Sequence, residues 1–256
     1  FNLLLGTCAG RNTTSGVGNV FLGKYAGCKN TTGDENIFIG RSAGKGDSSC
    51  SVTGDDNIGV GVCAGSAITL ADNSIFIGKL AGGIRKDAGI TGCCNIAIGY
   101  GSGMCLLTGC DNVFIGKSTA HSDCVTANRS VAVGGCALRK LKSGSYNTAL
   151  GWQAGECVCS GNSSVYIGFK AGHSITNARG NVMIGAESSA AGGTSGEYNT
   201  YVGKMTGNTA TGGCNVLLGY QAGKNRTSGG FNVAIGRCAF KGTGTATGGC
   251  NTTVGY

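Results

Sequence analysis

The chain repeats one pattern of polar and apolar positions along its whole length. An Asn or Ser is followed by an aliphatic residue, a variable residue, a second aliphatic residue and a Gly, mostly in steps of 17 residues with extremes of 16 and 21. Apolar side chains at alternate positions predict a short β-strand. A repeat of this length predicts one coil of a solenoid per copy. We therefore predict an all-β fold, a parallel β-solenoid (β-roll) of about fifteen coils with a period near 17 residues.

The predicted strands send their side chains to two faces. In Val20-Phe21-Leu22 the aliphatic pair points one way and Phe21 the other. We predict that the aliphatic pair faces the interior of the coil and that the middle residue faces outward. A continuous apolar stripe at the middle position typically marks an interface, although a wider coil or the chain's own loops are an alternative cover for it. We therefore predict a homo-oligomer with interface residues Phe21, Phe38, Phe76, Phe114, Tyr166 and Tyr201.

Polar and small residues flank each predicted strand. The Gly that follows predicts a corner with positive φ or a close backbone approach. The Asn that precedes, buried at a corner, is predicted to hydrogen-bond backbone groups and its equivalents in neighbouring coils, a structural role that we favour over ligand binding. Segments such as Asn30-Thr31-Thr32-Gly33 predict outward turns with a second, poorer strand. The predicted Asn ladder comprises Asn2, Asn19, Asn36, Asn57, Asn95, Asn112, Asn147, Asn181, Asn199, Asn215, Asn232 and Asn251.

Composition supports a single repeating structure. Gly supplies 51 of 256 residues and Pro none, and a chain without Pro keeps every backbone donor for hydrogen bonds between coils. No linker interrupts the repeat, so we predict one uninterrupted array over residues 1–256. Because the chain begins and ends inside a repeat, we expect it to be an excerpt or mature segment of a longer chain.

Several classes of function are disfavoured by the sequence. The net charge of +8 is not gathered into Lys/Arg runs, which argues against nucleic-acid binding. No stretch approaches the roughly 18 to 20 apolar residues that cross a bilayer, so we predict no membrane span. There is no pair of Cys-x-x-Cys units, His121 and His173 stand alone as histidines, and no nucleophile or phosphate-binding motif occurs. We predict no metal, no cofactor and no enzymatic activity.

The fifteen cysteines indicate an oxidising environment outside the cell. Cys93 and Cys110 each lie two residues before an Asn in adjacent coils, and coils stacked about 4.8 Å apart would bring them within bridging range. They are the predicted disulfide. The alternative is that several cysteines are small buried residues, since Cys8, Cys63, Cys136 and Cys238 share one position of the repeat.

Two further surface features follow from the register of the repeat. The position after the Gly predicts a basic and aromatic column that binds glycans through charge and ring stacking, or else a solvated edge that discourages aggregation. Asn-x-Ser/Thr triplets predict N-glycosylation at Asn12, Asn30 and Asn225, which share a turn. The column contains Lys24, Arg41, Lys79, Tyr100, Lys117, Trp152 and Tyr220.

Three segments carry a resemblance to a known family. Asn-Val-Phe-Leu-Gly-Lys-Tyr-Ala-Gly at 19–27, Ser-Val-Ala-Val-Gly at 130–134 and Asn-Val-Ala-Ile-Gly at 232–236 resemble the head repeats of trimeric autotransporter adhesins. The segment at 147–155, Asn-Thr-Ala-Leu-Gly-Trp-Gln-Ala-Gly, is similar to repeats in bacteriophage fibre proteins. The resemblance covers essentially the full chain and implies a parallel β-roll in which three chains pack side by side.

These features together predict an extracellular structural fibre or adhesin shaft on a cell or virion surface, giving a stiff projecting rod or a filament. The predicted partner is the chain itself, as a trimer or filament. The alternative is a glycan-binding receptor-recognition module of a surface adhesin or a viral or phage tail fibre, with surface glycans as the partner.

Overall fold

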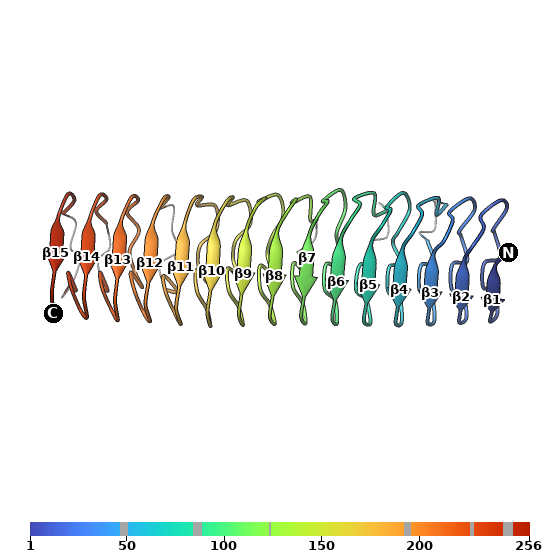
Figure 1. Ribbon diagram of the computed structural model, residues 1–256, viewed down its shortest axis with the longest axis horizontal. Coiled ribbons are helices and arrows are strands. Elements are labelled where there is room, and N and C mark those ends of the chain that lie inside the picture. Colours follow the sequence, from blue (N-terminus) through green and yellow to red (C-terminus); the bar gives the residue numbers. More distant parts are fainter. Residues whose placement is uncertain (47–50, 84–88, 123, 192–195, 226–227, 243–247) are drawn as a thin grey trace. The chain divides into compact units, whose positions relative to one another are not determined.

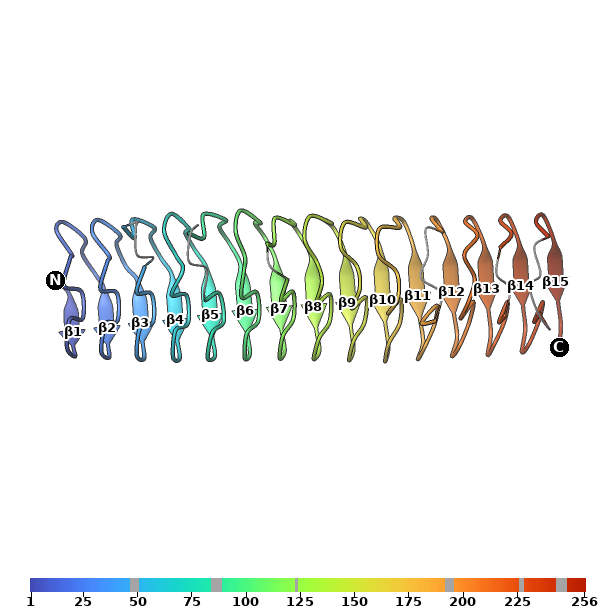
Figure 2. The same ribbon diagram turned by 180° about the vertical axis from the view of Figure 1, so that it is seen from behind.

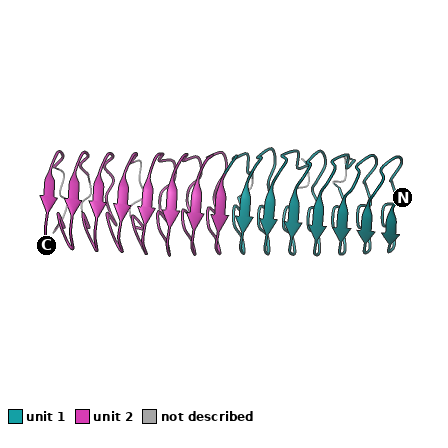
Figure 3. Ribbon diagram, viewed as in Figure 1, with its two compact units in different colours: residues 1–129 teal, residues 130–256 magenta. Residues whose placement is uncertain are grey.

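A computed structural model describes residues 1–46, 51–83, 89–122, 124–191, 196–225, 228–242 and 248–256. The chain divides into two compact units, residues 1–129 and residues 130–256 (Figure 3). Each unit is built from three-residue parallel strands joined by long turns, and the described residues contain no helix. The same repeat runs through both units.

In unit 1 the strands pair in chain order, each with the next (Figure 1). The register advances by one repeat at every step, so that Val20 pairs with Ile37 and Ile37 with Ile58. Equivalent residues therefore lie directly above one another. The strands are β1 (Leu3–Leu5), β2 (Val20–Leu22), β3 (Ile37–Ile39), β4 (Ile58–Val60), β5 (Ile75–Ile77), β6 (Ile96–Ile98) and β7 (Val113–Ile115).

Unit 2 repeats this arrangement with parallel pairs in chain order (Figure 2). Its strands are β8 (Val131–Val133), β9 (Thr148–Leu150), β10 (Val165–Ile167), β11 (Val182–Ile184), β12 (Thr200–Val202), β13 (Val216–Leu218), β14 (Val233–Ile235) and β15 (Thr252–Val254). The fold is thus the predicted parallel β-solenoid. The fifteen strands of the described ranges bound about fourteen complete coils, one fewer than expected.

The structure reverses the predicted orientation of the strands. In β2 it is Phe21 that is buried, at 0% exposure, whereas Val20 and Leu22 are half-buried. A strand places residues two positions apart on the same face, and because Asn19 points inward, Phe21 must follow it. The sequence prediction places Asn19 inside the coil and Phe21 outside it. Both cannot hold in one extended strand, because the two residues lie two positions apart. The predicted interface residues Phe21, Phe38, Phe76, Phe114, Tyr166 and Tyr201 are therefore core residues, and the interface prediction was wrong in naming them.

The turn segments complete the interior. Ile68, Ile90, Leu106 and Val125 of unit 1 are at most 2% exposed. Isolated parallel bridges join Asn30 to Val52, Ile68 to Ile90 and Leu106 to Val125. These bridges are what remains of the poorer second strand that the sequence indicates. Where these bridges occur, a coil of unit 1 has a regular strand on one side and a bridged turn on the other.

The Gly after β3 is required by two constraints at once. Gly40 has φ of +127°, and a Cβ built on it would lie 2.6 Å from the carbonyl oxygen of Gly61 in the next coil. A side chain would therefore meet both backbone strain and a clash with fixed backbone atoms. This position sets how closely consecutive coils approach at the corner.

Candidate functional site

The outward face of each sheet is aliphatic. The first and third residues of the strands lie there, and Ile39, Ile77 and Ile115 of unit 1 are exposed by 37%, 37% and 36%. We call these residues the aliphatic face. In unit 1 it comprises Val20, Leu22, Ile37, Ile39, Ile58, Val60, Ile75, Ile77, Ile96, Ile98, Val113 and Ile115.

The aliphatic face of unit 2 has the same construction with two Thr substitutions. Leu150, Val202 and Ile235 are exposed by 37%, 37% and 40%. Thr148 and Thr200 keep the β-branched shape of the aliphatic residues at this position and add one hydroxyl each. Its members are Val131, Val133, Thr148, Leu150, Val165, Ile167, Val182, Ile184, Thr200, Val202, Val216, Leu218, Val233 and Ile235.

The Asn ladder lies on the inner side of the same strands. The side chain of Asn36 is 0% exposed; its Oδ1 accepts the backbone N–H of Asn57 at 3.0 Å, and its Nδ2 donates to the Gly54 carbonyl at 2.9 Å. Asn36 therefore joins its coil to the next through two backbone groups. Ser74 accepts the N–H of Asn95 at 3.2 Å, so a Ser in this position keeps one of the two bonds.

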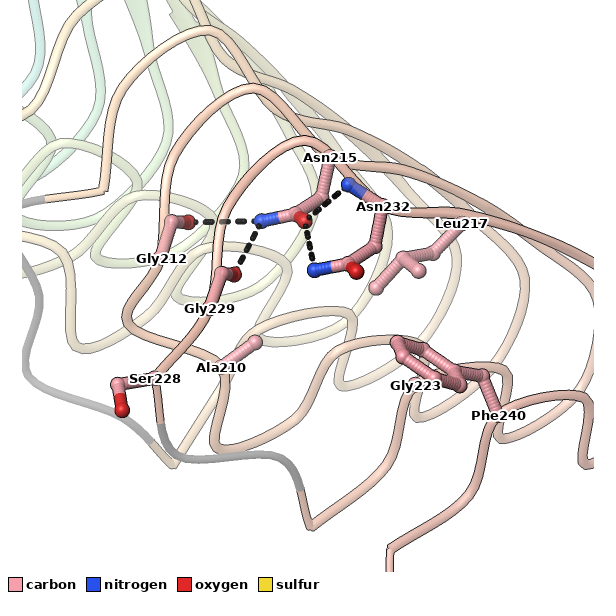
Figure 4. Close-up of a pocket in the computed structure, with 9 residues that line it drawn as sticks. All are labelled: Ala210, Gly212, Asn215, Leu217, Gly223, Ser228, Gly229, Asn232 and Phe240. Atoms are coloured by element: carbon pink, nitrogen blue, oxygen red, sulfur yellow. Dashed lines mark hydrogen bonds between the residues drawn. The ribbon is translucent and has the colours of Figure 1, made fainter. Parts of the chain in front are cut away.

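A close view of unit 2 shows the same ladder beside a cavity (Figure 4). Asn215 donates to the carbonyls of Gly212 and Gly229 at 3.0 and 3.2 Å, and Asn232 donates to Asn215 Oδ1 at 2.9 Å. The cavity holds about 10 Å³, which is room for one water molecule at most. With their donors and acceptors already engaged by the protein, these Asn residues act on structure and do not line a ligand site.

The column after the Gly lies on the surface and is held in register by the backbone. In unit 1, Ser42 donates its N–H to the carbonyl of Lys24 at 2.9 Å, and Gly101 donates to Lys79 at 3.0 Å. Neighbouring members therefore stack coil on coil. The members Lys24, Arg41, Lys79, Tyr100 and Lys117 are all exposed, and the Lys79 Nζ lies 5.9 Å from the Tyr100 ring centroid.

The same column in unit 2 presents aromatic rings. Trp152 and Phe169 follow each other in adjacent coils and are exposed by 50% and 46%. A Cβ added to Gly135 would lie 2.5 Å from Cζ3 of Trp152, so the indole ring covers the backbone of the preceding coil. Tyr220 is exposed by 41% and lies under Arg237, whose guanidinium carbon is 5.9 Å from the ring centroid.

The predicted disulfide partners are neighbours but free thiols. The backbone N–H of Cys93 donates to Cys110 Sγ at 3.2 Å, which shows that the two residues stack in adjacent coils. The Cys8, Cys63, Cys136 and Cys238 set has φ near +58° and intermediate exposure, so these are corner residues and not fully buried ones.

The predicted glycosylation sites differ in accessibility. Asn12 and Asn225 are exposed. Asn30 is 0% exposed and its Nδ2 donates to the Gly33 carbonyl at 2.9 Å, so the prediction for Asn30 was wrong for the folded chain. Asn30 takes the inward place that Val52 takes in the next coil, because the two residues are bridged.

An ionic cluster of unit 2 escaped the sequence analysis. Glu156 is 5% exposed; its Oε1 accepts from Arg139 Nε and Nη2, both at 2.7 Å, and its Oε2 lies 3.0 Å from His173 Nε2. His173 therefore has a partner in space although it had none in sequence. The available signal was the spacing: Arg139, Glu156 and His173 are successive members of one repeat position, 17 residues apart.

Within the described residues, no group of three or more His, Cys, Asp or Glu side chains has the arrangement of a metal site. The same part of the chain contains no helix long and apolar enough to span a membrane. Comparisons of the chain with protein-family models, with curated proteins and with solved structures find no match. The resemblance to adhesin heads and phage fibres stays a prediction.

Proposed function

We propose that this chain is a structural segment of an extracellular fibre or adhesin shaft, and that copies of it associate side by side through the aliphatic face. The observation that carries the proposal is the outward column of Ile, Val and Leu, interrupted only by Thr148 and Thr200, on the strands from β2 to β7 and from β8 to β14. Water-exposed apolar area is unfavourable, and a contiguous apolar patch on a soluble protein marks an interaction surface.

The size of the face is adequate for association. Strands lie about 4.8 Å apart, so the seven strands of unit 1 extend over roughly 30 Å. From the residue before the Asn to the residue after the Gly, a coil is roughly 20 Å wide at about 3.3 Å per residue. Each unit, with the positions that flank its aliphatic face, thus offers about 600 Å², so two copies that pack one such unit on another bury about 1,200 Å² in total, the lower end of a stable interface.

Sedimentation velocity over a range of concentrations tests the proposal. We expect the chain to be larger than a monomer, and Ile39→Lys with Ile77→Lys to lower its association constant at least tenfold. A matched control is Leu70→Lys, which also charges an exposed aliphatic residue of unit 1 but in a turn. A wild-type chain that stays monomeric at micromolar concentration would remove the proposal.

A second candidate function is glycan binding along the column after the Gly. It is favoured by the exposed rings of Trp152 and Phe169, which lie in adjacent coils and offer faces to the apolar side of sugar rings. We propose testing it on a glycan array with Trp152→Ala, Phe169→Ala and Tyr220→Ala combined. Tyr146→Ala, an exposed ring of unit 2 outside this column, is the control. Equal binding by the combined variant and the wild type would exclude this role.

A disulfide between Cys93 and Cys110 belongs to the same proposal, since an extracellular rod gains from covalent links between coils. Their stacking in adjacent coils supports it. Mass spectrometry of peptides from chain secreted into an oxidising medium would show the cross-linked pair. Two alkylated thiols at these positions in such material would rule it out.

A further inference from the structure

Unit 1 carries a line of exposed cations in the column after the Gly. The backbone holds the column in register, since the Cys63 N–H donates to the Arg41 carbonyl at 3.0 Å and the Ser118 N–H to the Tyr100 carbonyl at 2.9 Å. The line begins after β2 and ends after β7, which is roughly 24 Å at about 4.8 Å per coil. We call these residues the cation line: Lys24, Arg41, Lys79 and Lys117.

The chain itself does not neutralise the cation line. None of its members forms an ion pair with a carboxylate among the described residues. The acids of unit 1 are engaged elsewhere: Asp55 Oδ1 accepts the Asp34 N–H at 2.7 Å, and Asp111 Oδ2 lies 3.5 Å from Arg129 Nε. Consecutive cations are one or two coils apart, about 5 to 10 Å, so they repel one another. An anionic chain laid along the line would relieve that repulsion.

Aromatic rings accompany these cations. Lys24 Nζ and Lys45 Nζ lie 5.2 and 5.8 Å from the centroid of the Tyr25 ring. Tyr100 belongs to the column itself, is 47% exposed, and has Lys79 Nζ 5.9 Å from its ring centroid. A cation beside an aromatic ring is thus present twice along unit 1. This combination suits a ligand whose repeating unit has both a negative charge and an apolar face.

Acidic sugars have both features. A pyranose ring that bears a carboxylate offers C–H groups for packing on an aromatic ring and one charge for Lys or Arg. A polymer of such sugars repeats the two features along a line, as the column does. A single nucleic-acid strand fits less well, because it is bound largely by stacking of successive bases on aromatic side chains. The column of unit 1 has one ring, that of Tyr100.

We infer that unit 1 binds an acidic polysaccharide lengthwise, with the carboxylates on the cation line and a sugar ring on Tyr100. This inference rests on the glycan binding proposed above for the same column and adds the charge class and direction of the glycan. Each carboxylate accepts charge-assisted hydrogen bonds from a Lys or Arg side chain. Such exposed ion pairs are individually weak. Affinity therefore comes from several contacts made by one polymer chain.

Polygalacturonate tests the charge class, with its fully methyl-esterified form as the matched neutral polymer. In calorimetric titrations we expect the acid form to bind at least about tenfold more tightly than the ester, and to weaken as salt rises. Oligomers too short to reach from Lys24 to Lys117 should bind more weakly than longer ones. Equal binding of acid and ester would overturn the inference and leave glycan binding intact. Binding of neither would also overturn it, while the array variants of unit 2 still decide glycan binding.

Charge removal locates the site. One variant replaces the four residues of the cation line by Gln. The control replaces four exposed cations outside the column by Gln, so both variants lose the same net charge. Circular dichroism verifies that each variant folds. We expect the first variant to lose at least about tenfold in affinity for polygalacturonate and the control less than about twofold. Equal losses would overturn the inference. The control positions are Arg11, Lys140, Lys142 and Lys241.

Tyr100→Ala tests the contact with the sugar ring. Polyglutamate is the comparison polymer, because it carries carboxylates without sugar rings. We expect the substitution to weaken polygalacturonate binding by about threefold to tenfold and to leave polyglutamate binding unchanged. A wild-type chain that binds polyglutamate or single-stranded poly-dT as tightly as polygalacturonate would be a general polyanion binder, and the inference would fall.

Discussion

The rings of Phe21 and Phe38 stack in adjacent coils of unit 1, with centroids 5.3 Å apart and planes inclined by 12°. Both rings are fully buried. Phe38→Ala should therefore lower the free energy of unfolding by about 3–5 kcal/mol, through lost burial and the cavity left behind. Urea denaturation measured at a concentration where the chain is monomeric gives the value. The control is Ile39→Ala on the outward face; a larger loss there than at Phe38 would contradict the inward position of the rings.

The Asn ladder predicts a graded response to substitution. Asn36→Ala removes the acceptor of the Asn57 N–H and of Asn57 Nδ2 and the donor to the Gly54 carbonyl, which should cost about 2–4 kcal/mol. Asn36→Ser should cost about half as much, because Ser74 shows that a hydroxyl keeps the bond to the next backbone N–H. Denaturant titration orders the two variants. Equal losses would mean that the bond to the Asn57 N–H, which Ser keeps, does not contribute to stability.

The ionic cluster of unit 2 predicts a local effect on stability. Glu156→Gln keeps the side-chain shape but removes the carboxylate charge that faces Arg139, and it should lower the free energy of unfolding by about 1–3 kcal/mol. Thermal unfolding is a suitable measurement. Glu197→Gln removes a more exposed partner of Arg179 and should have a smaller effect. A reversal of that order would show that burial of Glu156 does not govern the strength of the cluster.

Burial of Tyr166 predicts a loss of stability in alkali. Removal from water raises the pKa of this phenol from 10.0 to about 12. Between these values the unfolded chain has lost the proton that the folded chain keeps, so the free energy of unfolding falls as the pH rises. The contribution is fully present below pH 10 and amounts to about 2–3 kcal/mol in all. Denaturation at several alkaline pH values should show a shallower decline for Tyr166→Phe; an unchanged decline would exclude this cause.

Much of the fold could be predicted because the repeat itself carries the information. The spacing of Asn and Gly sets the coil, and the parallel register of Val20 on Ile37 follows from aligning one copy with the next. The orientation of the strand could have been predicted as well, since burial of Asn19 fixes the side on which Phe21 lies. Hydrophobicity alone does not decide the orientation, because Val20 and Phe21 lie on opposite faces and are both apolar. The prediction that the aliphatic pair forms the core rested on hydrophobicity and was therefore wrong.

Other features depend on neighbours that a single coil does not reveal. The Glu156 cluster and the burial of Asn30 arise from residues in adjacent coils, and only alignment of whole coils brings them together. The aliphatic face is likewise a property of the stack. The alternating pattern alone does not say whether its residues face the interior or the surface. That is decided only when the Asn ladder is placed inside.

The turns of this solenoid are free to vary in length. The step from Ile37 to Ile58 is 21 residues and that from Val20 to Ile37 is 17, yet both keep the strand register. Extra residues are therefore taken up outside the ladder without disturbing the corners. A peptide epitope or a recognition loop inserted at such a turn would be displayed at a chosen position along the stacked coils. The chain is thus a scaffold in which the inserted segment can change while the solenoid stays the same.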